Sequence, residues 1–105
     1  MKAALFVGGW EGHRPTDFSD WCRALLEAEG CVVDVYDTLE PLASPETLSD
    51  VDLIVPIWSS ARSSHQPEFG TMTKPQEDGL LGLVAAGCCL AGWHGHMGAA
   101  FRDRP

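Results

Sequence analysis

The stretch AALFVGG, residues 3–9, decides the fold class of this chain. Five apolar residues run without interruption from position 3 to position 7, and Gly8-Gly9 ends the run. A continuous apolar run of this length is typical of a strand that is buried on both faces, as in a parallel sheet covered by helices. The stretch therefore predicts a buried strand at 3–7 that is followed by a loop.

Residues 17–29 follow with helical periodicity. The apolar positions of one helical stripe are Phe18, Trp21, Cys22, Leu25 and Leu26. Thr16 is expected to cap the start of this helix, and Gly30 stands where a left-handed glycine ends a helix. We expect the stripe to pack on the sheet.

The same alternation of strand and helix patterns continues along the chain. We expect strands at 31–36, 52–58 and 88–91, a short helix capped by Ser44, and a helix from Thr73 to about Ala86. Thr73 and Gln76 have the spacing of a capping box, and residues 59–73 between strand and helix are polar and irregular. Cys88 and Cys89 are expected inside the buried last strand. The alternation predicts a parallel, doubly wound α/β sheet.

Composition and charge exclude several classes of function. The chain has 105 residues, enough for one small domain, and its net charge is −8 with seven basic residues. Binding to nucleic acid or to an anionic membrane needs clustered Lys and Arg, so neither partner is expected. No apolar run reaches the ~20 residues of a membrane span. The four cysteines form no CxxC pair, which favours reduced thiols and a cytoplasmic protein.

Histidines and tryptophans gather where the predicted strands end. In open α/β sheets, ligands bind outside the carboxyl ends of the strands. His13, His65, His94 and His96 fall in loops after strands, and the tryptophans Trp10, Trp58 and Trp93 lie at or just after the ends of strands. Indole rings offer apolar walls and one N–H donor each. The sequence therefore predicts a site lined by His and Trp at this edge.

The individual residues leave alternatives open. His94, in GWHGH, follows a strand as a nucleophile elbow would, but it can also be a loop histidine bonded to a carbonyl. His96 can belong simply to the turn into a next helix, and Glu11 is either a general base or a solvated carboxylate. His65 is interpreted as an ordinary exposed residue. His13 and His94 could hold zinc or another divalent metal, although no HExxH spacing enforces such a site.

Four motifs together carry a family resemblance. GGWEGH at 8–13, DLIVPIW at 52–58, LAGWHG at 90–95 and AFRD at 100–103 resemble the ThuA-like family of trehalose-utilisation proteins, a branch of the class I glutamine-amidotransferase-like superfamily. The family's motifs fall on Gly8, Gly9, Trp10, Gly12 and His13, and on Gly92, Trp93, His94 and Gly95. The resemblance implies a flavodoxin-like three-layer α/β/α domain with a parallel sheet of strand order 2-1-3-4.

The resemblance also implies a function. His94 stands where an amidotransferase has its nucleophilic Cys, so thiol-dependent glutamine hydrolysis is not expected. The expected substrate is a sugar or keto-sugar, with His94, His13 and Glu11 as catalytic groups. Trp10, Trp58, Trp93 and His96 are then the residues expected to contact the substrate. The alternatives are a sugar- or metal-binding module without turnover, and an assembly unit without activity of its own.

ThuA-like domains are about twice as long as this chain, so the resemblance covers an N-terminal half. In the order 2-1-3-4 the strand at 88–91 lies on an open edge of the sheet. Open edges pair readily with other chains. We therefore expect a homo-oligomer, or association through this edge.

Overall fold

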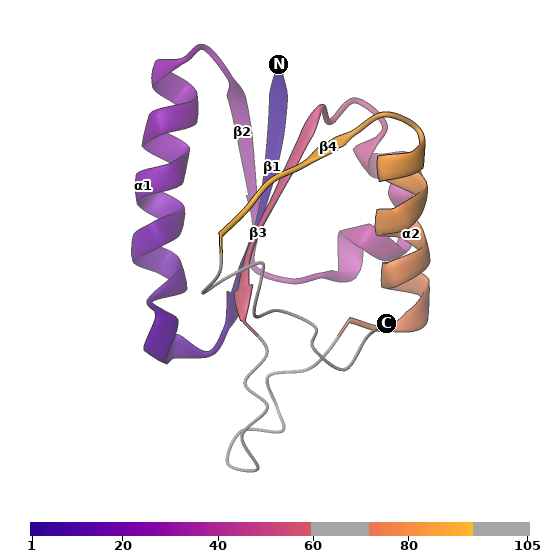
Figure 1. Ribbon diagram of the computed structural model, residues 1–105, viewed down its shortest axis with the longest axis horizontal. Helices are drawn as coiled ribbons and strands as arrows, with labels where there is room; N and C mark the ends of the chain where they lie inside the picture. The colour runs from indigo at the N-terminus through magenta and orange to yellow at the C-terminus, as the bar shows by residue number, and fades with distance from the viewer. Residues whose placement is uncertain (60–71, 94–105) are drawn as a thin grey trace.

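The computed structural model describes residues 1–59 and 72–93, which form a parallel sheet with helices on both faces (Figure 1). The strands are β1 (Lys2–Gly9), β2 (Val32–Tyr36), β3 (Leu53–Ser59) and β4 (Cys89–Leu90). The helices are α1 (Pro15–Ala28) and α2 (Lys74–Ala85), with short 3₁₀ segments η1 (Glu11–His13), η2 (Glu40–Ala43) and η3 (Pro45–Leu48). The sheet order is β2-β1-β3-β4 and every pairing is parallel. The predicted α/β fold with strand order 2-1-3-4, a small flavodoxin-like sheet, is confirmed.

β1 is buried on both faces, as its continuous apolar run predicts. Ala4 and Phe6 point to the α2 side and join one apolar core, whereas Ala3 and Leu5 point to the α1 side and join a second. Each of these four side chains is at most 1% exposed. β1 also lies between β2 and β3, so its backbone is bonded along both edges. β1 therefore contributes side chains to the apolar cores on both faces of the sheet.

Both α-helices end in the same way, on a glycine in the left-handed conformation. After α1, Gly30 donates to the carbonyl of Glu27 and Cys31 donates to the carbonyl of Leu26. After α2, Gly87 and Cys88 make the two equivalent bonds, to Val84 and Leu83 respectively. This pair of bonds is the Schellman motif, which satisfies carbonyls that the helix end leaves open. Each glycine turns the chain directly into the next strand.

The start of α1 differs from the prediction. The helix begins at Pro15, and its N-cap is Arg14 in the left-handed region (φ 52°) rather than Thr16. Proline is favoured in the first turn of a helix because it has no N–H to leave unpaired. Pro15 thus starts the helix one residue before the predicted cap, and Thr16 lies within its first turn.

The predicted apolar stripe of α1 is only partly buried. Cys22 is buried, and Leu26 is partly buried against the same core, but Phe18, Trp21 and Leu25 are 40%, 56% and 50% exposed. The buried side of the helix runs instead through Pro15, Ser19 and Cys22. The apolar arc of α1 is therefore wider than its contact with the sheet, and one flank of the helix stays open.

The remaining elements cover the other face of the sheet. The capping box of α2 is confirmed: the Thr73 side chain accepts from the Gln76 N–H, and the Gln76 side chain accepts from the Thr73 N–H. The short helix expected after Ser44 is the 3₁₀ segment η3, a second 3₁₀ segment, η2, precedes it, and the Ser44 side chain makes no cap bond. Since Pro41 and Pro45 each start a separate short turn, no continuous α-helix forms. Leu42 and Leu48 from these turns are buried with Leu83 of α2.

β4 is shorter than the predicted strand 88–91. The Cys88 N–H is used in the cap of α2, so the ladder to β3 begins at Cys89, which donates to the Asp52 carbonyl. Ala91 continues it by donating to Ile54. Cys88 is partly buried against the α2-side core, but Cys89 and Leu90 are exposed because no described strand pairs beyond β4, so the expectation of a core position is wrong for Cys89. In the described part of the chain all four cysteines are free, and no helix is long and apolar enough to cross a membrane.

Candidate functional site

The carboxyl end of β1 is built around a close contact between a glycine and a tryptophan. Gly8 of β1 pairs with Trp58 of β3, so the two residues point to the same face of the sheet. The indole ring of Trp58 lies where a β-carbon on residue 8 would stand. Any side chain at position 8 would displace this ring. Gly8 is therefore needed for packing here, and the glycine pair is not a phosphate loop.

Trp58 itself carries an unusual polar atom. Its Nε1–H is buried and has no hydrogen-bond partner among residues 1–59 and 72–93. Leaving a buried donor unsatisfied costs about 1–3 kcal/mol, so most buried indole N–H groups bond to an acceptor. The ring packs on the α2-side core and is held in place by its contact with Gly8. This leaves one fixed donor near the end of β3 that a ligand oxygen could satisfy.

A second aromatic residue, Trp10, comes directly after the last residue of β1. Trp10 precedes the 3₁₀ turn η1, in which the His13 N–H donates to the Trp10 carbonyl at 3.2 Å. The turn folds the two rings together edge to face, with their centroids 4.7 Å apart. The Trp10 indole also occupies the space where a β-carbon on Gly12 would stand. The spacing of GWEGH thus produces an indole–imidazole pair, and Gly12 is what permits it.

Glu11 lies in the same turn with its side chain exposed. Its backbone carbonyl accepts from the Arg14 N–H at 2.9 Å, which closes η1. The predicted residues Trp10, Glu11, His13 and Trp58 therefore lie at the carboxyl ends of the adjacent strands β1 and β3. A group with an apolar face and several hydroxyls could meet an indole wall, an imidazole, a carboxylate and a free indole donor here.

Trp93 occupies a different place from the other two predicted tryptophans. It packs against the core on the α1 side of the sheet, and its ring lies 5.9 Å from Phe18 and 6.1 Å from Trp21. Trp58, by contrast, packs on the α2 side. Trp10 and Trp93 come after β1 and β4, whereas Trp58 is the second-last residue of β3, and the sheet directs Trp58 and Trp93 to opposite faces. The sequence pattern predicts that these residues lie near the carboxyl ends of the strands, but it does not predict which face of the sheet each one packs on.

The predicted residues His94 and His96 lie outside the described residues, as does His65. His13 is thus the one predicted metal ligand that the structure describes. Within residues 1–59 and 72–93, no group of three or more His, Cys, Asp or Glu side chains is placed to hold a metal ion. Zinc or another divalent metal at His13 and His94 remains a prediction.

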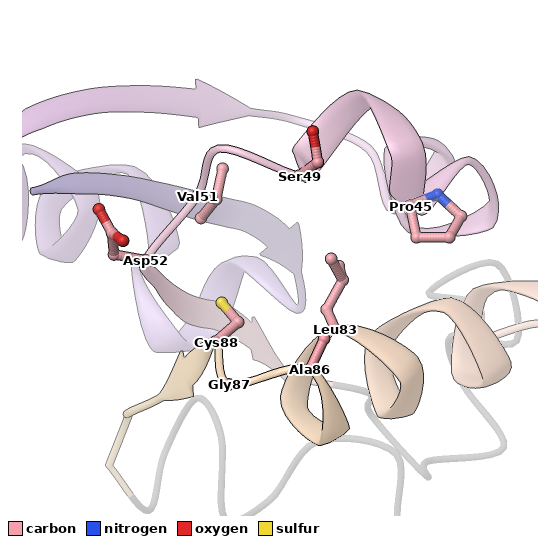
Figure 2. A pocket seen from close by; sticks show the side chains of 8 residues that line it. All are labelled: Pro45, Ser49, Val51, Asp52, Leu83, Ala86, Gly87 and Cys88. Atoms are coloured by element: carbon pink, nitrogen blue, oxygen red, sulfur yellow. The ribbon is translucent and has the colours of Figure 1, made fainter.

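A cavity of about 320 Å³ lies at the amino ends of the strands, where β3 begins and α2 ends (Figure 2). It is lined by Pro45, Ser49, Val51, Asp52, Leu83, Ala86, Gly87 and Cys88. Burial raises the pKa of the Cys88 thiol, and the neighbouring Cys89 and Asp52 raise it further. The thiol therefore stays protonated near neutral pH and is a poor nucleophile. The sequence offered no motif for this cavity, because distant turns and the end of a helix form it.

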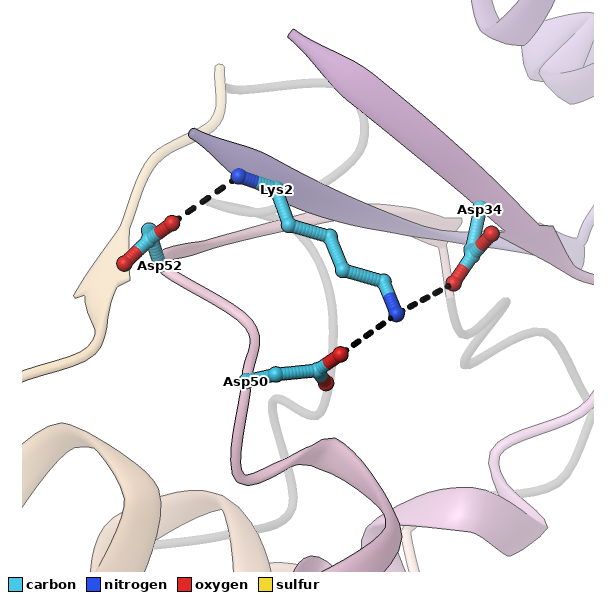
Figure 3. Close-up of polar contacts among 4 residues, drawn as sticks. All are labelled: Lys2, Asp34, Asp50 and Asp52. Carbon is cyan, nitrogen blue, oxygen red and sulfur yellow. Dashed lines mark hydrogen bonds and ion pairs between the residues drawn. The ribbon is translucent and has the colours of Figure 1, made fainter.

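Beside this cavity, Lys2 joins three aspartates (Figure 3). Its Nζ lies 2.8 Å from Asp50 and 3.3 Å from Asp34, and its backbone N–H donates to Asp52 at 2.9 Å. The hydrogen bonds to Asp50 and then Asp34 raise the pKa of Lys2, and the bond to Lys2 lowers the pKa of Asp50. The cluster ties β1 to β2 and to the segment before β3, so its role is structural.

Comparison with protein-family models, with curated proteins and with solved structures gives no significant match.

Proposed function

We propose that this chain binds a sugar or keto-sugar at the carboxyl edge of the sheet, between the Trp10–His13 pair and Trp58. The observation that carries the proposal is the buried Trp58 Nε1–H, which has no hydrogen-bond partner in the part of the chain that the structure describes. A buried donor next to apolar ring surface suits a ligand that combines an apolar face with oxygen acceptors. Sugars have this combination, since their C–H faces stack on indoles while their hydroxyls and carbonyls form hydrogen bonds.

The Trp10–His13 turn supports the same ligand class. The imidazole is half-buried beside the indole, and the Glu11 carboxylate is exposed in the same turn. Together they offer one stacking surface and two groups that can exchange protons with a hydroxyl or carbonyl. The resemblance to ThuA-like proteins adds His94 and His96 as further groups of the site and trehalose or a keto-sugar as the substrate. On this proposal the chain acts in carbohydrate utilisation without Cys-dependent amidotransferase chemistry.

Titration calorimetry with glucose, trehalose and a 3-keto-glycoside tests the binding step. Trp58→Phe keeps an aromatic ring over Gly8 but removes the donor, and we expect it to weaken binding about tenfold, a loss of about 1.4 kcal/mol. Trp21→Phe, the same change on the exposed flank of α1, is the matched control and should leave the affinity unchanged. Equal affinities for the Trp58→Phe and wild-type proteins would remove the main support for the site.

Turnover is tested separately. Keto-sugar isomerisation or cleavage of 3-keto-glycosides should be lost in His13→Ala and in His94→Ala, and reduced in Glu11→Gln. If sugars bind but no member of the panel is turned over, the chain is a binding module and the proposed catalytic roles are wrong.

A further inference from the structure

The exposed flank of α1 carries three large apolar side chains in a row. Phe18, Trp21 and Leu25 lie at helical spacing, and each is between 40% and 56% exposed. A shallow groove of about 250 Å³ lies along the first part of this flank, between Phe18, Trp21, Arg14 and Asp17. Single exposed apolar residues are ordinary, but a contiguous group of them marks an interaction surface.

The sheet next to this flank has room for a second helix. Four strands about 4.8 Å apart span roughly 19 Å, whereas one helix with its side chains is about 10 Å wide. On one face of the sheet, α2 shares the covering with the turns η2 and η3. On the other face, α1 is the one helix among the described residues, and the core beneath it includes side chains of β1, β2 and β3. Cys89 of β4 pairs with Leu53, which packs on the α1 side, and Cys89 is exposed there.

The flank is complementary to itself when two copies of α1 run antiparallel. A two-fold axis beside Trp21 places Phe18 opposite Leu25 of the second copy, and Leu25 opposite Phe18. The same axis places Arg14, at the start of the helix, opposite Glu29 of the second copy, at its end. Both charged residues are exposed, and antiparallel helices also align their dipoles favourably. In this antiparallel arrangement, each apolar position of the flank faces an apolar position of the second copy, and each charged position faces an opposite charge.

We propose that this flank, defined by Arg14, Phe18, Trp21, Leu25 and Glu29, is the interface of a two-fold dimer in which α1 packs antiparallel on α1 of a second copy. The three apolar side chains expose on the order of 300 Å² in each copy, given the size of such residues. A stable interface covers about 800 Å² per partner, so neighbouring residues must add the rest. The dimer is thus weak, with dissociation in the micromolar range. It does not depend on the ligand site at the carboxyl edge.

Sedimentation velocity of the 105-residue chain tests the dimer. The measurement spans about 5 to 300 µM at ~0.15 M salt, where the Debye length of ~8 Å screens the net charge of −8. We expect a concentration-dependent shift from monomer to dimer. Leu25→Glu should weaken dimerisation at least tenfold. Leu81→Glu, the same change at a 58% exposed leucine of α2, is the matched control and should change it less than twofold.

Charge exchange tests the antiparallel arrangement. Arg14→Glu and Glu29→Arg should each weaken the dimer several-fold, and an equimolar mixture of the two variants should recover most of the loss. Thermal melts establish that each variant is folded, and Leu25→Ala provides a milder change at the same position. A chain that stays monomeric at every concentration overturns the proposal. So does a dimer that Leu25→Glu leaves intact and Leu90→Pro abolishes, because that result places the interface at the β4 edge.

Discussion

At the scale of single residues, the Lys2 cluster makes a pH-dependent contribution to stability. The pKa of Lys2 is raised in the folded chain, so its contribution is fully present below its ordinary value and is lost as pH rises through the folded pKa. The pKa of Asp50 is lowered, so its contribution is present above its ordinary value and is lost as pH falls through the folded pKa. The cluster therefore stabilises the fold between about pH 4 and pH 10.

Replacing Lys2 with Met should make the pH dependence of this stabilisation measurable. We expect Lys2→Met to lower the melting temperature at pH 7 by a few degrees, and by clearly less at pH 3, because the contribution of Asp50 is lost as the pH falls through its lowered pKa. The charges are exposed, so the effect is small. Arg23→Met is the control, because Arg23 pairs with Glu27 within α1 and ties no two elements together. An equal loss at pH 3 and pH 7 for Lys2→Met would mean that the lysine acts through packing and not through charge.

At the scale of the helix, two glycines of α2 have opposite roles. A β-carbon on Gly79 would collide with the backbone carbonyl of Leu42, so this glycine lets the turn η2 approach the helix. A β-carbon on Gly82 would meet nothing within 4 Å. We expect Gly82→Ala to stabilise the chain by about 0.5–1 kcal/mol, because alanine loses less backbone entropy in a helix.

Gly79→Ala should instead destabilise the chain by about 1–3 kcal/mol, since the turn must move to accept the methyl group. Urea denaturation of both variants gives the two free energies of unfolding on one scale. A gain in stability from Gly79→Ala would show that η2 does not pack on α2 as described.

The elements that the sequence predicts well are those with local causes. Gly30 ends its helix in the predicted way, and Thr73 and Gln76 form the predicted capping box, because all the atoms involved lie within a few residues of each other. Helical periodicity gives the direction of a side chain, but it does not state how much of the apolar arc another element covers. For this reason Phe18, Trp21 and Leu25 belong to the predicted stripe and are nevertheless exposed.

In the candidate site, too, the features with local causes could be predicted from the sequence, and those that depend on pairing between distant strands could not. The Trp10–His13 pair arises within one short turn, so the motif GWEGH alone contains the information for it. The position of Trp58 over Gly8 depends on the register between β1 and β3, which are some fifty residues apart in the sequence. No local pattern indicates that its indole N–H is buried and unpaired. Strand alternation could not place Trp58 and Trp93 on opposite faces without that register.

At the scale of the whole molecule, the sheet predicts a gradient of stability from its centre to its edge. β1 is bonded on both sides and buried on both faces, whereas β4 has two residues, both exposed. Local opening is easiest where few apolar contacts hold the backbone. Hydrogen exchange should therefore be slowest for the amides of β1, such as Leu5, and much faster along β4.

The amide of Leu90 distinguishes the two ways in which copies of this chain could associate. Cys89 and Ala91 donate to β3, so the alternation of a strand directs the Leu90 N–H away from β3, toward the open edge. A dimer through the α1 flank leaves this edge open, and Leu90 should then exchange rapidly even at 300 µM. A dimer through β4 would pair this N–H with a second copy, and its exchange would slow as the concentration rises. We expect rapid exchange at Leu90 at every concentration, with slower exchange confined to the amides at the α1 interface.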